Sequence, residues 1–517
     1  MIICNLYDKL KNSLCTHPIG LSSNNPIQKK ISHDWLRCYR MEWKVNRDAD
    51  KPLYQQIYEY IEEKISYGEY PPGSLLPSER KLAQQLNVNR MTIAHVYDEL
   101  QASGLVERKK GSGTRVSSHK WGILPKGVTN WRRYIEGGSF IPSYPLIRRI
   151  RGEAKIMENG FNLANGKLSS DLFPTEYLQS VLSKQPFPND LEYEHSQGLL
   201  SLRETIANYV KEYHQIHTTS SSVLITSGAQ QALHLITQCL LNPGDAVAIE
   251  APSYCYSLPL FQSAGLRIFG LPVDANGINP DDIMTLHEKH KIRMIFLNPT
   301  YHSPTGAILS ETRRKKVLEI SAELGIPIVE DDPVSLLTFE DEQHMPMKSL
   351  DRSGNVLYVG SLSKVIGSSL RIGWLIGPQS VINRLADARE QIDFGLSVFP
   401  QMIANQFLQS PEYPRHLDFL RYELVERRNE MVTVLHEILG NKVAFTVPKG
   451  GLFIWCKINR DVDDQKLVDE GIKHKILFMP GSVYGSPNGY VRLTFAHLKK
   501  ESIREAVSRF AEVLEQI

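Results

Sequence analysis

Apolar residues in the first part of the chain recur with the period of a helix. From Pro52, the spacing of three and four residues predicts a first amphipathic helix, which the run Tyr70-Pro71-Pro72-Gly73 ends. Ser78 is a suitable N-cap for a second helix, and a third is expected over residues 90–102. Two short strands around a basic, glycine-containing tip follow over residues 105–116. This pattern predicts a winged helix-turn-helix.

Beyond about Phe161 the pattern changes to short apolar runs separated by helix-length segments. These runs are Val223 to Thr226, Ala246 to Ile249, Arg293 to Leu297, Ile326 to Val329 and Val356 to Val359. Such alternation predicts an α/β fold with a mostly parallel sheet covered on both faces. Ligands of these sheets gather at the carboxyl ends of the strands, so the residues that follow each strand are candidates for a site.

The length of 517 residues predicts two or three domains. We expect an N-terminal extension at 1–40, the winged domain at 50–118, a linker at 119–155 and the large domain, with a small C-terminal α+β lobe, at 156–517. The linker holds eight basic residues against two acidic ones. That excess indicates either a polyanion contact or a solvated connector.

Composition narrows the class of protein. With 42% hydrophobic and 22% charged residues and no apolar run near the length of a membrane span, the chain is typical of soluble globular proteins that do not enter a membrane. The N-terminus does not resemble a secretory signal, and the six cysteines are scattered without metal-ligand spacing. We therefore expect a cytoplasmic protein and no metal site.

The winged segment resembles the GntR family of DNA-binding regulators. The matching residues are Pro77-Ser78-Glu79-Arg80-Lys81-Leu82-Ala83 and Gly104-Leu105-Val106. The third helix would present its N-terminal side chains to base edges of double-stranded DNA, with Arg90 suited to guanine. The expected DNA-contacting set is Ser78, Arg80, Asn89, Arg90, Thr92, Lys109, Lys110 and Gly111, with Arg80 and the two lysines on phosphates. Residues 41–118 contain eleven basic and eleven acidic residues, so DNA binding is inferred from clustering, and a protein-binding module is the alternative.

A lone lysine, Lys364, follows the last of the apolar runs. Small hydroxylic residues surround it, and an arginine, Arg371, stands seven positions later. An amine in such a setting suits a Schiff base to a phosphorylated aldehyde, although a surface lysine in a serine-rich turn has the same pattern. The run resembles the pyridoxal 5′-phosphate (PLP) lysine motif of fold-type I aminotransferases. The resemblance implies that Ser361, Ser363 and Arg371 lie near the phosphate.

Other strand ends match the same family. The resemblance implies that Gly228, Ala229 and Gln230 hold the phosphate, that Tyr254 stacks on the pyridine ring and that Asp331 meets its nitrogen. Arg492 would take a substrate α-carboxylate. Two positions depart from the family: Ser303 stands at the usual Asn, and Pro333 and Val334 replace the usual Tyr. Both usual hydrogen bonds to the ring hydroxyl are thereby in doubt.

The combination resembles the MocR subfamily of GntR-type transcription regulators over nearly all of residues 50–517. It implies a DNA-binding regulator that holds PLP as a Schiff base on Lys364, with Lys364 and Asp331 as the catalytic residues if chemistry occurs. It also implies an amino-acid or amine effector and a homodimer in which Tyr193 reaches a partner subunit. A PLP-dependent aminotransferase with an appended DNA-binding domain is the alternative, and a scaffold with a vestigial site is a third reading.

Overall fold

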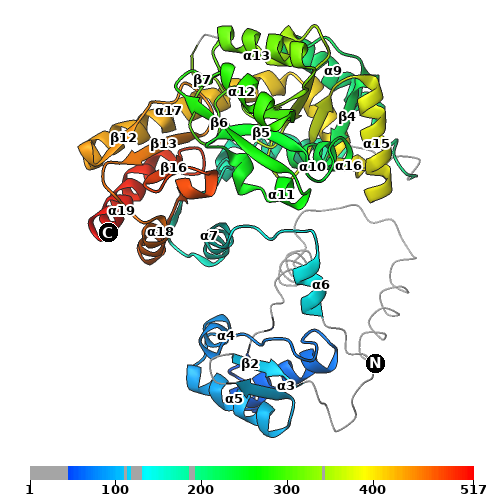
Figure 1. Cartoon of the computed structure of the whole chain (residues 1–517). Helices are drawn as coiled ribbons and strands as arrows, with labels where there is room; N and C mark the ends of the chain where they lie inside the picture. Colours follow the sequence, from blue (N-terminus) through cyan, green and yellow to red (C-terminus); the bar gives the residue numbers. More distant parts are fainter. Residues whose placement is uncertain (1–42, 44, 110–112, 118–130, 185–191, 341–343) are drawn as a thin grey trace, which may run out of the picture. The chain divides into compact units, whose positions relative to one another are not determined.

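The computed structural model describes residue 43 and residues 45–109, 113–117, 131–184, 192–340 and 344–517. Two compact units divide the chain, Met1–Gly137 and Gly138–Ile517 (Figure 1). The expected extension at 1–40 lies outside the described residues, as do Lys110 and Gly111 of the wing tip.

The smaller unit is the predicted winged helix-turn-helix. Its elements are α3 (Leu53–Ser66), α4 (Glu79–Leu86), α5 (Arg90–Ala102), the antiparallel pair β1 (Val106–Lys109) and β2 (Gly113–Val116), and α6 (Trp131–Gly137). The helix-spaced residues Ile57, Ile61 and Val96 are buried together in its core. Ser78 caps α4 by accepting from the backbone N–H of Lys81, as its position predicted.

The larger unit is built on an eight-stranded sheet in the order β4-β11-β10-β9-β8-β5-β6-β7. Strands β10, β9, β8, β5 and β6 are parallel, whereas β11 is antiparallel to both of its neighbours. The mostly parallel sheet is therefore confirmed. The strands are β4 (Val223–Thr226), β5 (Ala246–Ala251), β6 (Arg267–Asp274), β7 (Gly277–Ile278), β8 (Ile292–Leu297), β9 (Ile328–Asp332), β10 (Val356–Ser361) and β11 (Gly373–Ile376).

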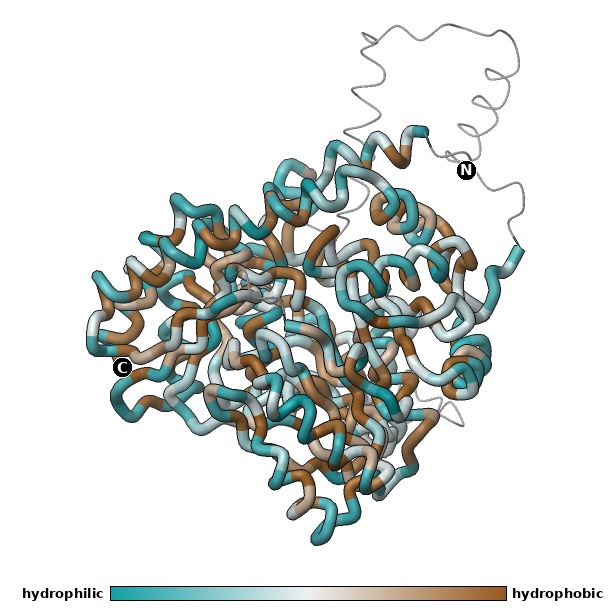
Figure 2. The backbone as a smooth tube through the Cα atoms, turned by 90° about the horizontal axis from the view of Figure 1, so that it is seen from above, coloured by the Kyte–Doolittle hydropathy of each residue, from teal (hydrophilic) through white to brown (hydrophobic). Residues whose placement is uncertain are grey.

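Helices cover both faces of this sheet because successive side chains of each strand point to opposite sides. Along β5, Val247 and Ile249 join the core beneath α10 and α15, while Ala246 and Ala248 join the core beneath α12 and α13. Figure 2 shows hydrophobic positions gathered in the interior of this unit. The covering helices are α8 (Thr175–Lys184), α9 (Leu200–His214), α10 (Ala229–Cys239), α11 (Leu260–Ser263), α12 (Asp281–His290), α13 (Glu311–Leu324), α14 (Met347–Leu350), α15 (Gln379–Asp393) and α16 (Val398–Gln409).

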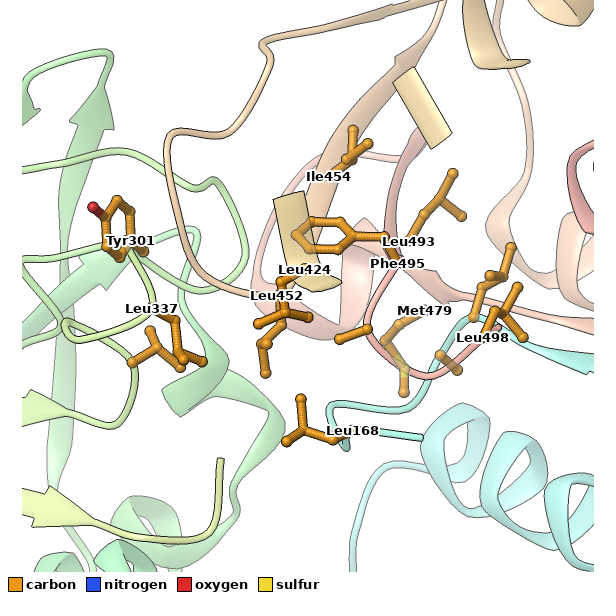
Figure 3. Packing of buried hydrophobic residues seen from close by; sticks show 14 of the residues in the cluster. Leu168, Tyr301, Leu337, Leu424, Leu452, Ile454, Met479, Leu493, Phe495 and Leu498 are labelled. Carbon is orange, nitrogen blue, oxygen red and sulfur yellow. The ribbon is translucent and has the colours of Figure 1, made fainter. Parts of the chain in front are cut away.

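The C-terminal part forms a lobe around a four-stranded sheet, β12-β13-β16-β15. Leu452, Ile454 and Phe495 of this lobe pack in one core with Tyr301 and Leu337 from the loops of the large sheet (Figure 3). That shared core fixes the lobe against the ends of the parallel strands. The elements are α17 (Glu412–Leu439), β12 (Val443–Phe445), β13 (Phe453–Ile458), α18 (Asp464–Lys473), β14 (Ile476–Leu477), β15 (Met479–Pro480), β16 (Tyr490–Thr494) and α19 (Ile503–Glu515), with β3 (Phe161–Asn162) parallel to β14.

The expected linker contributes a helix to the larger unit. Helix α7 (Pro145–Ile156) buries Ile147 and Ile150 in the main core and packs beside α18. Its apolar positions are few and stand among basic residues, which is why the sequence pattern suggested a connector. No helix in the described part of the chain is long and apolar enough to cross a membrane.

Candidate functional site

Lys364 lies in the turn that directly follows β10, as the pattern predicted. Its amine donates a hydrogen bond to the carbonyl oxygen of Gly166, from the segment after β3. Burial lowers the pKa of this amine to about 8, and the positive charge of Arg492 acts in the same direction, whereas Asp331 opposes it. A lysine with this pKa supplies the neutral, nucleophilic amine far more readily than an exposed lysine does.

Asp331 lies on the neighbouring strand β9, opposite Val359 in the register with β10. The carboxylate is buried, and the hydroxyl of Tyr254 donates to its Oδ2. Its Oδ1 is also buried and has no hydrogen-bond partner among the described residues. Burial raises the pKa of Asp331 to about 7. An orphaned buried carboxylate oxygen is costly in a folded protein, and a protonated ring nitrogen would satisfy it.

A small cradle surrounds the N-terminus of α10. Gly228 has a φ of +74°, and a Cβ on it would lie 2.6 Å from Nη2 of Arg371. That nitrogen donates to the carbonyl oxygen of Ser227 at 2.7 Å, so the guanidinium lies against the start of the helix. Ser361 and Ser363 share a hydroxyl hydrogen bond of 3.0 Å nearby in the chain. Free helix N–H groups, a guanidinium and hydroxyls are the donors that a phosphate requires.

The two remaining residues of the expected cradle are less enclosed. Ala229 begins α10 and is half-buried, while Gln230 is exposed.

Arg492 projects from β16 into the same region. The planar guanidinium lies over the ring of Phe453, with its central carbon 3.9 Å from the ring centroid, and 5.0 Å from that of Tyr484. Nη2 donates to the carbonyl oxygen of Ala164 at 3.0 Å, and the buried Nε has no partner among the described residues. Burial lowers the pKa of this guanidinium, yet it remains a cation at neutral pH.

Ser303 links the strand end that carries Asp331 to Arg492 of the C-terminal lobe. Its backbone N–H donates to Oδ1 of Asn298 at 2.7 Å, and Asn298 in turn donates to the carbonyl oxygen of Asp331 at 2.8 Å. Its hydroxyl accepts from Nη1 of Arg492 at 3.3 Å. The serine at this position therefore contacts the arginine, while Val334 is buried without a polar group to offer.

Several residues of this site were not assigned from the sequence. Asn298 carried a signal, because it stands directly after β8 in the run that contains Ser303. Phe453 follows the turn at Gly450 and Gly451, and its sequence context gave no indication of a role at the site. Gly166 carried none, since it acts through its backbone oxygen and lies 198 residues from Lys364.

Five of the predicted DNA-contacting residues lie at the start of two helices of the smaller unit: Ser78 and Arg80 at α4, and Asn89, Arg90 and Thr92 at α5. Asn89 caps α5 by accepting from the N–H of Met91 at 2.9 Å, Arg80 is exposed, and Thr92 is half-buried. Arg90 is exposed and pairs with Glu79 at 3.0 Å. For Lys109, the strand is described and the side chain is not.

Arg108, which precedes Lys109 in the wing strand, has two acidic partners within the smaller unit. It pairs with Glu79 at 3.3 Å and with Asp98, and it donates to the carbonyl oxygen of Ala94 at 3.2 Å. These contacts hold the wing strand against α4 and α5. The positive charge of Arg108 is therefore largely neutralised by acidic residues of the same unit.

The larger unit thus has the fold and the polar strand ends of an aminotransferase, and the smaller one is a regulatory helix-turn-helix. The aminotransferase class I and II family matches residues 158–510, and the gntR family of bacterial regulatory proteins matches residues 53–116. The chain belongs to the GntR-type transcription regulators that carry an aminotransferase-like domain, the arrangement of the MocR subfamily.

Relatives and solved structures agree with this assignment. The chain is 36% identical to the HTH-type transcriptional regulator YdfD of Bacillus subtilis, over 90% of this chain and 97% of that protein. It is 31% identical to the regulator NorG of Staphylococcus aureus, over 86% of this chain and all of that protein. A kynurenine aminotransferase of Pyrococcus horikoshii superposes with a TM-score of 0.69 at 27% identity, over 76% and 98% of the two chains. LysN of Thermus thermophilus, an α-aminoadipate aminotransferase complexed with N-(5′-phosphopyridoxyl)-L-leucine, superposes with 0.69 at 26%, over 75% and 99%.

Proposed function

We propose that this transcription regulator binds PLP covalently through Lys364 and responds to PLP or to an amino-acid or amine effector. The observation that carries the proposal is the buried Oδ1 of Asp331, which has no partner among the described residues and lies in the same site as a lysine of lowered pKa. The LysN structure contains N-(5′-phosphopyridoxyl)-L-leucine, which supports the binding of a phosphopyridoxyl group by this fold.

Each residue of the site would contact a different part of PLP. Lys364 would supply the amine, the cradle at Gly228 and Arg371 would receive the phosphate, and Asp331 would accept a hydrogen bond from the protonated ring nitrogen. When bound, PLP supplies an electron sink that weakens the bonds to the α-carbon of an attached amino acid. Tyr254 positions Asp331 by donating a hydrogen bond from its hydroxyl.

An effector would compete with Lys364 for the cofactor. An amino acid that displaces the lysine leaves the amine free to recover its hydrogen bond to Gly166. The carboxylate of the effector would pair with Arg492 on the C-terminal lobe, so binding biases how that lobe packs against the large sheet. A ligand shifts the equilibrium between two arrangements of the lobe only if it binds one of them more tightly than the other. The pair between the effector carboxylate and Arg492 would provide that difference in affinity.

We also propose that the working form is a homodimer bound to two half-sites. Tyr193 is 84% exposed, and Phe394, 5.5 Å from it between ring centroids, is 61% exposed. Large aromatic side chains in an exposed patch are typical of an interface. Paired winged units would match a palindromic operator.

The direct test measures binding to intergenic DNA beside the gene, with and without PLP and with a panel of amino acids and amines. We expect sequence-specific binding whose affinity changes at least several-fold with one effector, only in PLP-loaded protein. Binding that is indifferent to PLP and to every member of the panel would refute the sensing role. Lack of any specific binding would refute the DNA-binding role.

The lowered pKa of Lys364 predicts how PLP loading depends on pH. The neutral amine is the reactive form, so the rate of covalent loading should rise with pH and level off above about 8, well below the usual lysine value near 10.5. Stopped-flow absorbance with added PLP measures this rate. A profile that keeps rising to pH 10 would mean that the lysine is not buried as described.

Arg90 and Arg80 should give different DNA-binding defects. Arg90→Ala removes the side chain suited to guanine, so we expect a loss of about 1–3 kcal/mol in discrimination at one base pair. Arg80→Ala removes an exposed cation suited to a phosphate, which should weaken all sequences alike and lower the salt slope by about 1. Binding measured on a set of point-substituted operators separates the two. Equal losses on every operator for Arg90→Ala would exclude it from base readout.

Metabolic transamination is the second candidate function, and the presence of Lys364, Asp331 and Arg492 in the sequence supports it. The hydroxyl of Ser303 is engaged by Arg492 and Val334 offers no donor, so the usual partners of the ring hydroxyl are lacking. Sustained formation of keto acid over many turnovers would favour the enzyme. A single partial turnover would favour the regulator.

A further inference from the structure

Helix α7 displays a row of basic side chains on the larger unit. Arg148, Arg151 and Lys155 are exposed, while Ile147 and Ile150 are buried. At about 100° per residue, the three cations fall within about 60° of one another around the helix axis. They form one continuous strip, which we term the α7 basic row.

The part of the chain that the structure describes does not neutralise the α7 basic row. Arg149, on the flank of the row, pairs with Asp469 of α18. Glu470 of α18 pairs with Lys473 at 2.6 Å, and the buried Asp464 accepts hydrogen bonds from the backbone N–H groups of Ser482 and Gly489. Among the described residues, no side chain forms an ion pair or hydrogen bond with the three cations of the row. A strip of unpaired cations is electrostatically suited to a polyanion.

The position of the row in the chain favours DNA as that polyanion. Residues 138–144 join α7 to the end of the smaller unit, so the row lies in the part of the larger unit nearest to the winged unit along the chain. Of the acidic residues near the row in sequence, Glu153 is half-buried on another side of α7. Duplex DNA carries one negative charge per roughly 1.7 Å, so any flank of an operator offers a regular line of phosphates.

We propose that the α7 basic row binds phosphates of the duplex flanking the operator, as a second and sequence-independent DNA contact. The proposal rests on the proposed DNA binding by the smaller unit. Contacts of this kind position a protein on the duplex and carry no base preference. They would let the larger unit, which holds the effector site, act on the same DNA molecule as the winged unit.

The test compares full-length, PLP-loaded protein on two duplexes, one trimmed to the operator and one with long flanks of unrelated sequence. We expect the wild type to bind the flanked duplex more tightly and with a steeper salt dependence. Three phosphate contacts correspond to a slope difference of about 2.7 for each row that engages DNA, or about 40-fold in affinity per row between 50 and 200 mM salt. R148Q/R151Q/K155Q should lose this difference and match the wild type on the trimmed duplex.

A matched control removes three exposed cations elsewhere on the larger unit. K289Q/K315Q/K316Q changes α12 and α13, which cover one face of the large sheet (Figure 1). This variant should still bind the flanked duplex more tightly than the trimmed one. Equal salt slopes for the wild type and the α7 variant on the flanked duplex would overturn the proposal. So would a loss of self-association with unchanged DNA binding, measured by sedimentation, because it would make the row a protein interface. If no protein binds either duplex specifically, the proposed DNA-binding role itself fails.

Discussion

Lys364→Ala should abolish covalent retention of PLP. The wild-type protein, loaded with PLP, reduced with borohydride and denatured, should keep the cofactor attached in near-stoichiometric amount, whereas the variant should keep none. The physical reason is that, among the described lysines, only Lys364 feels the charge of Asp331 and has its pKa lowered to about 8 by burial. The measurement is the mass of the denatured chain, which does not depend on catalytic turnover.

Lys167→Ala is the matched control for this prediction. Lys167 lies close enough for its charge to lower the pKa of Lys364, but its side chain is exposed. We expect Lys167→Ala to retain attached PLP and Lys364→Ala to keep its operator binding while losing the effector response. Retention of attached cofactor by Lys364→Ala would contradict the assignment of the lysine.

The elements that position this lysine could be predicted from the sequence because their signal is local. β10 and β9 are continuous apolar runs that end in polar residues, so the turn at Lys364 and the place of Asp331 follow from the pattern itself. The winged unit was predictable for the same reason: the N-cap at Ser78 and the apolar face of α3 are both short-range features.

Contacts between distant segments could not be predicted in this way. Arg492 donates to Ala164 across 328 residues of the chain, and the two-residue strand β3 that places Ala164 has no period to detect. Arg108 is similar, because its pairing with Asp98 depends on how β1 packs on α5. The role of α7 was hidden by its basic composition, since two buried isoleucines suffice to anchor it.

The placement of Arg492 leads to a prediction about the effector. Arg492→Ala should weaken a carboxylate-bearing effector by about 2–5 kcal/mol, or at least roughly 30-fold in affinity, because the loss of one partner of a buried charged pair leaves the other unpaired. The amine obtained by decarboxylating the same amino acid should bind wild type and variant about equally. Titration of both ligands against PLP-loaded protein, followed by absorbance, gives the ratio.

Arg492→Lys separates the charge of this residue from its shape. A lysine keeps the positive charge that lowers the pKa of Lys364 but cannot form the two parallel hydrogen bonds of a guanidinium, so it should bind the carboxylate poorly while loading PLP with the wild-type pH profile. Arg492→Ala removes that charge, and the pH at which loading levels off should move above about 8. If the alanine variant lost affinity for the amine and the amino acid alike, Arg492 would be maintaining the packing inside the lobe, through Phe453 and Tyr484, instead of recognising a carboxylate.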